Sequence, residues 1–535
     1  MNRHTLLLAA ALLALGLILP CAASAQTPDH LTVGIAAISS VIDYETNAMT
    51  RCLEEDGNFE LDFITFAPEE MIDRLNLMIQ NGSALPDVLV FGSGHRPQPM
   101  LVYNWALSGA VIPLTGYVQS DAPSFTAAVA ECGTDLIPLI TMPDGEIYYL
   151  PSYRFSIANE YQHKNWIYQP WLDALGLEAP TDAESLYLVL RAFKEQDPNG
   201  NGLQDEIPLL TSAEMTAYVI RSLLSMFCDV GSMNDSIAVQ DGQLVASYAT
   251  EAYREGLRYI RRLVEEGLFS ALSFTIDEAQ FSAIVSQETT VVGMSVRPSL
   301  ATALPFDDPR RAEYVGIAPF AMADGTVLTP YTPTTANAHF VITSGCRNPE
   351  AAFRLGDLLC SEKFTIMNRW GLEGVDWVTP PEGSVSLYDF LGYEPLIMTT
   401  GHTTWGAPQN QYWASQGPFI RGYRLQCGQA WNGDPLDSEY MIARVMPEYI
   451  GKGPKEYIGM LNYTMEESEQ ISELLATVNS YVREMQLQFI TGVLSLDHDW
   501  DEYLRQLYAS DLDTVLRIMQ SAYDAQQATL AALTA

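Results

Sequence analysis

The sequence predicts an α/β fold of two or more structural units, and three observations support this prediction. The chain has 535 residues, whereas a domain usually contains about 100–200. Hydrophobic residues make up 48% and charged residues 18%, as in ordinary globular proteins rather than disordered ones. Near its start, short apolar segments alternate with segments of helical periodicity, which is typical of a largely parallel sheet covered by helices.

The elements of this first unit follow in order along the chain. Residues 31–36 are apolar and rich in strand formers, and residues 60–66 alternate apolar with polar side chains, so both are predicted strands. Pro68 opens a predicted helix over 69–80, which Asn81 and Gly82 end. Residues 88–91 form another apolar run and are predicted to be a buried strand.

The rest of the chain is richer in helical patterns. Helices are predicted over 182–195, 251–268 and 349–360, and strands over 289–296, 315–318 and 338–343. Residues 466–532 are predicted to be helical apart from a break at 492–499. Long loops between 379 and 435 carry several aromatic side chains, and long ordered loops are uncommon unless they are functional.

The first 25 residues are predicted to be a signal peptide. Arg3 and His4 precede an uncharged apolar run over 6–19, and small residues at 23–25 suit a signal peptidase. The run is too short to cross a bilayer, which needs about 20 residues. Lipid attachment at Cys21 is the main alternative, although Pro20 immediately before it fits that alternative badly, and a retained anchor helix is a further one. Either of the first two readings places the body outside the cytoplasmic membrane, at the cell surface, in the periplasm or in the medium.

The charge and the cysteines exclude several classes of function. The chain has 28 Lys and Arg against 66 Asp and Glu, a formal charge of −38. Nucleic acids and anionic membranes require clustered cations, so neither is an expected partner. Six cysteines follow the signal peptide without any Cys-x-x-Cys pair, which gives no support to zinc or redox motifs. Disulfides are compatible with an oxidising compartment, but the sequence does not define their connectivity.

Several segments resemble the extracellular solute-binding proteins of ABC importers, in the long branch that includes alginate oligosaccharide-binding proteins and related Gram-positive lipoproteins. The most specific matches are Trp171-Leu-Asp-Ala-Leu-Gly-Leu177 and the segment 192–208, followed by 253–268. Matches at 53–55, 69–87, 348–352, 370–377, 499–503 and 522–524 complete the set. The sequence departs from the family at 168–170, where the family usually carries a basic and an acidic residue before the tryptophan.

The resemblance implies a two-lobed periplasmic-binding-protein-like fold of type II, with a ligand cleft between the lobes and a helical C-terminal region. We expect the N-terminal lobe to comprise 26–152 plus 336–373, and the C-terminal lobe 153–335 plus 374–535. The chain is expected to cross between the lobes near 150–153, between 319 and 338, and near 371–374. Hinge closure of such lobes traps a ligand and excludes water.

A calcium loop is predicted after the helix at 182–195. Oxygen-bearing side chains at alternating positions, a glycine and a following acid match positions 1, 3, 5, 6 and 9 of a calcium-binding loop. Pro208 stands where the usual bidentate glutamate would be, and Glu206 replaces it, as the resemblance also implies. The alternative is a plain turn between a helix and a strand. The predicted ligands of this structural Ca²⁺ are Asp197, Asn199, Asn201, the carbonyl of Leu203, Asp205 and Glu206.

Aromatic and short polar side chains are the candidates for ligand binding. Sugar rings stack their apolar faces on Trp and Tyr, while their hydroxyls pair with polar groups. Ligands of open α/β sheets bind outside the carboxyl ends of the strands. The predicted contacts are Tyr44, Ser93, Tyr153, Trp166, Trp370 and Trp405; for each of the aromatic residues, packing in a core or lobe interface is the alternative.

The predicted function is the substrate-binding component of an ABC importer. It would be a monomer that captures an oligosaccharide or similar polar solute and delivers it unchanged to permease subunits. No organic cofactor and no catalysis are expected, because the sequence has no His-Glu-x-x-His, complete Gly-x-Ser-x-Gly or Walker loop. A secreted carbohydrate-active enzyme and a surface receptor that does not transport are the alternatives. The net acidity mildly disfavours anionic sugars, although the charge of a cleft can differ from that of the whole chain.

Overall fold

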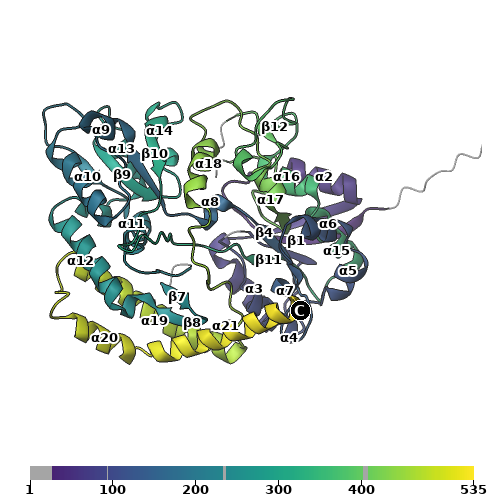
Figure 1. Cartoon of the computed structure of the whole chain (residues 1–535). Coiled ribbons are helices and arrows are strands. Elements are labelled where there is room, and N and C mark those ends of the chain that lie inside the picture. The colour runs from purple at the N-terminus through teal and green to yellow at the C-terminus, as the bar shows by residue number, and fades with distance from the viewer. Residues whose placement is uncertain (1–26, 93, 233–235, 402–407, 535) are drawn as a thin grey trace, which may run out of the picture.

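The first lobe, on the right in Figure 1, is built on a six-stranded sheet in the order β14–β4–β11–β3–β1–β2. The computed structural model describes residues 27–92, 94–232, 236–401 and 408–534. β1, β2 and β3 are parallel, β11 runs antiparallel to both of its neighbours, and β14 is parallel to β4. The strands are β1 (Asp29–Ala36), β2 (Phe59–Phe66), β3 (Val88–Val90), β4 (Leu150–Arg154), β11 (Ala336–Ile342) and β14 (Phe419–Arg421).

Helices pack against this sheet, because their apolar stripes face its buried side chains. In α3, for example, Met71 and Leu75 are fully buried one turn apart. The predicted helices at 69–80 and 349–360 are present as α3 and α15. The helices of this lobe are α2 (Ala48–Gly57), α3 (Met71–Gln80), α4 (Pro99–Leu107), α5 (Thr115–Ser120), α6 (Pro123–Glu131), α7 (Ile137–Ile140), α15 (Pro349–Leu359), α16 (Glu362–Trp370) and α17 (Tyr423–Cys427).

The second lobe is built on a four-stranded sheet in the order β10–β5–β9–β6. β5 (Lys164–Tyr168) runs antiparallel to both neighbours, β9 (Val292–Arg297) and β10 (Tyr314–Ile317), and β6 (Ile207–Leu209) is parallel to β9. Its helices are α8 (Ile157–Glu160), α9 (Gln169–Leu175), α10 (Ala183–Glu195), α11 (Thr216–Leu224), α12 (Glu251–Glu265), α13 (Glu278–Val285), α14 (Arg310–Glu313) and α18 (Ser438–Tyr449), and a hairpin joins β7 (Ile237–Gln240) to β8 (Gln243–Ala246).

Three C-terminal helices form a further layer, as predicted for the final 70 or so residues. α19 (Met465–Ile490) packs on α12, and after α20 (Trp500–Ala509) the last helix, α21 (Leu512–Thr534), packs on α19 and β8. α21 also contacts α7 of the first lobe, and it is the yellow helix along the lower edge of Figure 1. The C-terminal region therefore touches both lobes.

The third crossing between the lobes differs from the expectation. After α16 the chain forms the small β12 (Trp377–Val378) and β13 (Met398–Thr399) pair, and then returns to the first sheet as β14. It passes to the second lobe only between α17 and α18. The expected crossing near 371–374, and the assignment of all of 374–535 to the second lobe, therefore do not hold for the segment that contains β14.

The described residues contain neither a disulfide nor a candidate membrane span. The six cysteines after residue 26 are all free. None of the helices in the described ranges combines the length and the apolar character that crossing a bilayer requires. The predicted signal peptide at 1–25 and Cys21 lie outside the described residues.

Candidate functional site

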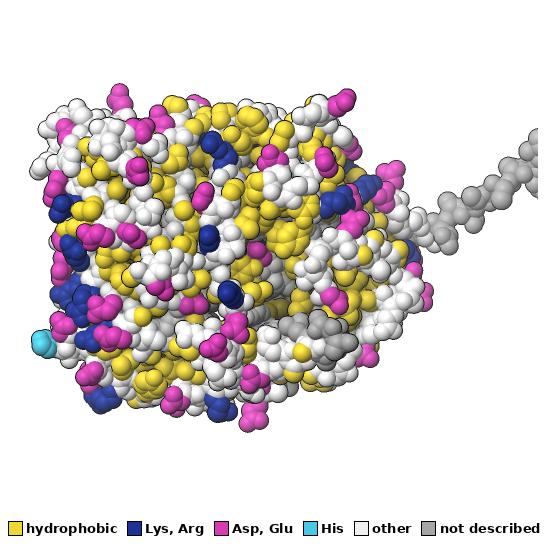
Figure 2. Space-filling view, viewed as in Figure 1, with side chains coloured by type: hydrophobic (Ala, Val, Ile, Leu, Met, Phe, Trp, Pro, Cys, Tyr) yellow, Lys and Arg dark blue, Asp and Glu magenta, His cyan; other side chains and the backbone are white. Residues whose placement is uncertain are grey.

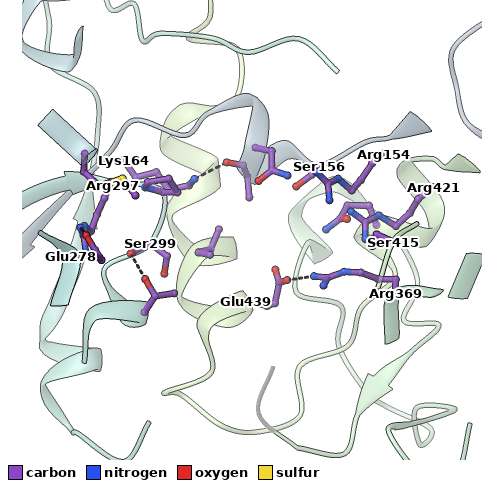
Figure 3. A pocket seen from close by; sticks show the side chains of 17 residues that line it. Arg154, Ser156, Lys164, Glu278, Arg297, Ser299, Arg369, Ser415, Arg421 and Glu439 are labelled. Atoms are coloured by element: carbon purple, nitrogen blue, oxygen red, sulfur yellow. Dashed lines mark hydrogen bonds and ion pairs between the residues drawn. The ribbon is translucent and has the colours of Figure 1, made fainter. Parts of the chain in front are cut away.

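A cavity of about 340 Å³ lies between the two lobes and is lined by residues of both (Figure 3). Its walls come from the end of β4 and the following turn into α8, from the ends of β5 and β9, and from α16, α18 and the segment around β14. Its volume falls in the range of about 300–1,000 Å³ that is usual for ligand pockets. Its position matches the cleft that the resemblance predicts.

Basic side chains dominate the charged lining of this cavity. Of the seven charged residues that line it, five are Arg or Lys, although the whole chain has more than twice as many acids as bases. The five cations are Arg154, Lys164, Arg297, Arg369 and Arg421, and the two carboxylates are Glu278 and Glu439. The lining thus reverses the charge balance of the chain.

Strand register explains why four of the cations lie in pairs. Arg154 ends β4 and Arg421 ends β14, and the two residues are direct partners across this parallel pair. On the other lobe, Lys164 begins β5 and is the direct partner of Arg297 at the end of β9. Partners across neighbouring strands project to the same face of a sheet. Each lobe therefore presents one pair of cations to the cavity.

Two of the arginines have carboxylate partners. Arg297 Nη2 lies 2.9 Å from Glu278 Oε2, and Arg369 Nη2 lies 2.6 Å from Glu439 Oε1. The Arg369 and Arg421 guanidinium groups also lie 5.8 and 5.7 Å from the ring centroid of Trp370. The Arg297–Glu278 pair lies within the second lobe, whereas the Arg369–Glu439 pair joins α16 of the first lobe to α18 of the second.

Arg421 is different, because it forms no ion pair with a carboxylate among the described residues, although the residue is only 3% exposed and its Nε and Nη1 have no hydrogen-bond partner there. Burial lowers the pKa of Arg421, and the nearby charges of Arg369 and Arg154 lower it further. The pKa of Arg154 is also lowered, by burial first and then by Arg369 and Arg96. The arginines on the first lobe are therefore close enough to repel one another.

Neutral polar groups also line the cavity. Ser156, Asn159, Ser299, Thr302 and Gln426 supply hydroxyl and amide groups. Ser299 Oγ and Gln426 Oε1 are buried without a hydrogen-bond partner in the described part of the chain. Such groups can donate to, or accept from, the hydroxyls of a polar ligand.

None of the four predicted contact residues that the structure describes lines this cavity. Tyr44 is a core residue whose hydroxyl donates to the Ala36 carbonyl at 2.8 Å. Trp166 is also a core residue, because it is 1% exposed and its indole nitrogen donates to the Arg297 carbonyl at 3.0 Å. For both, the packing alternative describes the observed contacts.

Tyr153 and Trp370 lie next to the lining instead. Tyr153 is buried beside Arg154 on β4, and its hydroxyl is 3.0 Å from Thr134 Oγ1. Direct contact of these two aromatic rings with a ligand stays a prediction. Ser93 and Trp405 lie outside the described residues.

The predicted calcium loop is closed by its own polar groups. The backbone nitrogens of Asn201 and Gly202 donate to the two carboxylate oxygens of Asp197, at 3.1 and 3.0 Å. The amide nitrogens of Asn199 and Asn201 donate to Asp205. Asp197 itself has a φ of +46°, so the loop departs from ordinary backbone geometry at its first predicted ligand.

The surroundings of the Glu206 carboxylate indicate whether these loop residues suit a cation. Both of its carboxylate oxygens are buried without a hydrogen-bond partner among the described residues. Burial raises the pKa of Glu206, and the charges of Asp205 and Asp197 raise it further. Within the described ranges, no group of three or more His, Cys, Asp and Glu side chains is arranged to hold a metal ion. The unpartnered carboxylate nevertheless fits a cation.

The chain is similar to several proteins that are named as binding proteins of transporters. No family profile matches the chain. It is 26% identical over 506 residues to the fructooligosaccharide ABC transporter substrate-binding protein FusA of Streptococcus pneumoniae serotype 4, covering 89% of this chain and 86% of FusA. It is 26% identical over 223 residues to the polygalacturonan/rhamnogalacturonan-binding protein YtcQ of Bacillus subtilis, covering 40% of each.

Solved structures show the same fold. FusA in complex with kestose superposes with a TM-score of 0.72 at 23% identity, over 94% of this chain and all of that chain. An HMO-binding solute-binding protein from Bifidobacterium longum infantis gives 0.75 at 21% identity, over 93% and 99%. Another FusA structure, with a TM-score of 0.71 at 23% identity over 94% and 100%, is an EF-hand mutant. The predicted resemblance and the predicted two-lobed fold are confirmed.

Proposed function

We propose that this chain, a homologue of the substrate-binding proteins of ABC transporters, captures an oligosaccharide between its lobes and hands it unchanged to membrane permeases. The observation that carries the proposal is the cavity, because residues of both lobes line it and the connections between the lobes lie beside it. Rotation of one lobe relative to the other would close such a site around a ligand and exclude water. A permease can then distinguish the loaded form from the empty one.

The residues that line the cavity suit ligand binding better than catalysis. Both carboxylates of the cavity form ion pairs with arginines, at 2.9 and 2.6 Å. A glycosidase needs one carboxylic acid that donates a proton and a second carboxylate that acts as base or nucleophile. Because each carboxylate of the cavity is already bound by an arginine, neither is free to take one of these roles.

Export is part of the proposal. The basic, apolar and small-residue segments of positions 1–25 have the order of a signal peptide. The mature protein would then act outside the cytoplasmic membrane, where it meets its ligand before the permeases do. Mass spectrometry of the protein from the native host distinguishes cleavage after Ala25 from lipid attachment at Cys21.

A glycan screen tests the main proposal. The purified protein is incubated with oligosaccharides of different composition, and its thermal unfolding midpoint is measured with each. A ligand at one hundred times its dissociation constant stabilises the folded state by about 2.7 kcal/mol, which is readily detected. Bound glycan is then recovered and its mass determined. Recovery of shortened glycan would support the enzyme alternative, and a complete lack of stabilisation by oligosaccharides would contradict the proposal.

We also propose that the loop containing Asp197, Asp205 and Glu206 holds a structural calcium ion. The support is the spacing of the oxygen ligands together with the buried, unpartnered carboxylate of Glu206. Calcium would neutralise three acids that otherwise repel one another, and would fix the link between α10 and β6.

Calcium should raise the unfolding midpoint of the wild type and leave that of the double variant Asp197→Asn/Asp205→Asn unchanged. Asp324→Asn is a matched control, because Asp324 also accepts a backbone hydrogen bond in an exposed turn but lies outside the loop. A calcium response that survives in the double variant would contradict the proposed site. Sites of this kind in extracellular modules bind calcium with dissociation constants of about 10⁻⁴–10⁻³ M, so millimolar calcium is appropriate.

A further inference from the structure

We infer that the ligand is an acidic oligosaccharide, whose carboxylates are bound by the cation pairs Arg154–Arg421 of the first lobe and Lys164–Arg297 of the second. This inference rests on the proposed function and adds the chemical class of its ligand. It also reverses the expectation from net charge, because the cavity and the rest of the chain carry opposite charge.

Strand pairing places two like charges side by side in each lobe. Like charges that are direct partners across neighbouring strands destabilise a sheet. Here such partners occur once in each lobe, Arg154 with Arg421 and Lys164 with Arg297, and all four residues line one cavity. Figure 3 shows the first pair on one side and the second on the other. An anion between the lobes would offset the repulsion in both sheets.

The cations of the first pair lack a counter-charge in the described part of the chain. Among the described residues, neither Arg154 nor Arg421 forms an ion pair with a carboxylate, whereas Arg297 and Arg369 each do. Leaving a buried charge without a partner costs several kcal/mol, and unpartnered buried donors are rare in folded proteins. Arg421 combines both conditions, since it is 3% exposed and two of its guanidinium nitrogens lack acceptors. The partner that Arg421 lacks is therefore assigned to the ligand.

The shape of the donors favours a carboxylate. A guanidinium group presents parallel N–H groups that match the two oxygens of a carboxylate. The unpartnered hydroxyl of Ser299 and the amide of Gln426 lie in the same lining and suit the hydroxyls of a sugar. With cations on both lobes, a ligand that carries two carboxylates would contact the two lobes at once and so favour their closed arrangement.

Matched ligands test the charge alone. Uronic acid oligosaccharides of several linkages are each titrated calorimetrically beside their own methyl esters, which have the same length and hydroxyl pattern without the charge. We expect at least one acid to bind about tenfold or more tightly than its ester, and this preference to weaken as salt is added. In Arg421→Met and Arg154→Met the preference should fall to about twofold or less.

The unliganded variants give an independent readout. If Arg421 exists to bind an anion, Arg421→Met removes an uncompensated buried charge, so its unfolding midpoint without ligand should equal or exceed that of the wild type. A purely structural arginine would instead lower it. Arg505→Met is the control, because Arg505 is exposed and already paired with Glu502, and neither its midpoint nor its ligand preference should change.

The outcomes separate the two proposals. Equal binding of acids and esters, or binding of neutral oligosaccharides alone, would overturn this inference and leave the proposed function intact. Inorganic sulfate or phosphate, or a sulfated oligosaccharide, binding as tightly as the acids do would overturn the assignment to carboxylates. If no oligosaccharide of either kind binds, the proposed function fails, and this inference fails with it.

Discussion

Lys164 is fully buried at the start of β5, where its ammonium group donates to the Ala158 carbonyl at 2.7 Å. Burial lowers the pKa of Lys164 to about 7, and the negative charge of Glu439 offsets only part of this decrease. An unfolded chain would hold this proton up to a pH of about 10.4. Between these two values the unfolded state binds more protons than the folded state, so stability rises with pH through this group.

We therefore expect Lys164→Met to reduce the gain in unfolding free energy between pH 7 and pH 9 by about 1–2 kcal/mol, since one pKa unit corresponds to about 1.4 kcal/mol. Urea unfolding of the wild type and the variant at the two pH values measures this difference. Lys363→Met, at a half-exposed position that is paired with Asp56, is the control and should follow the wild type. Parallel pH dependences of the wild type and Lys164→Met would contradict the prediction.

Substitutions at Trp166 and Ser299 should distinguish a residue that packs in the core from one that binds the ligand. Trp166→Phe removes a buried hydrogen bond to the Arg297 carbonyl and part of a core side chain, so it should lower the unfolding free energy by about 1–3 kcal/mol. Ser299→Ala removes a hydroxyl that has no partner among the described residues, so stability should be unchanged while ligand affinity falls. Chemical unfolding and calorimetry of both variants check this contrast. A loss of stability in Ser299→Ala together with a loss of ligand affinity in Trp166→Phe would contradict this assignment.

At the scale of elements, the end of α16 positions two residues beside the cavity. Gly371 follows Arg369 and Trp370 and has a φ of +83°, and a Cβ there would lie 2.2 Å from Asp376 Oδ2. That oxygen already accepts the backbone hydrogen bond of Leu372 at 2.8 Å. The turn after α16 thus leaves no room for a side chain.

Gly371→Ala should lower the unfolding free energy by more than the 1–3 kcal/mol that is typical of backbone strain alone, and should weaken ligand binding through Arg369. Gly374→Ala is the matched control, because Gly374 has a similar φ of +79° but open space around its Cβ position. The difference between the two variants in urea unfolding measures the clash. Equal losses would mean that strain at positive φ accounts for both.

Some helices and strands could be predicted from the sequence and others could not. Helices and strands with sustained periodicity, such as α3, α12 and β2, were accessible because many residues repeat one pattern. β14 has only three residues within a long irregular stretch, and its place in the first sheet depends on pairing with β4 over 260 residues earlier in the sequence. For this reason the third crossing was expected too early in the chain.

Long-range pairing also explains what was missed in the candidate site. Arg154 and Arg421 become neighbours only through the register of β4 and β14, and Lys164 and Arg297 only through β5 and β9. Nothing in the residues around each of them indicates a partner. The aromatic candidates were selected from local context, and Tyr44 and Trp166 proved to fill the cores of their lobes.

At the scale of the molecule, ligand binding should bring the two lobes together. Small-angle X-ray scattering with saturating ligand should give a smaller radius of gyration than without ligand, because a ligand that contacts both lobes favours their closed arrangement. Arg421→Met with the same acidic ligand should show a smaller response at equal concentration. Identical scattering curves for the free and the saturated wild-type protein would contradict hinge closure.

The acidic exterior has a consequence for the speed of uptake. Asp and Glu side chains are spread over the face seen in Figure 2, and the chain carries a formal charge of −38. A polyanionic sugar approaching from solution is repelled by this surface before it reaches the basic interior, and ions screen such repulsion over about 10 Å at 0.1 M. Added salt should therefore raise both the association rate and the dissociation rate of the sugar. Exchange of bound sugar would then be faster at high ionic strength, even though the affinity is lower.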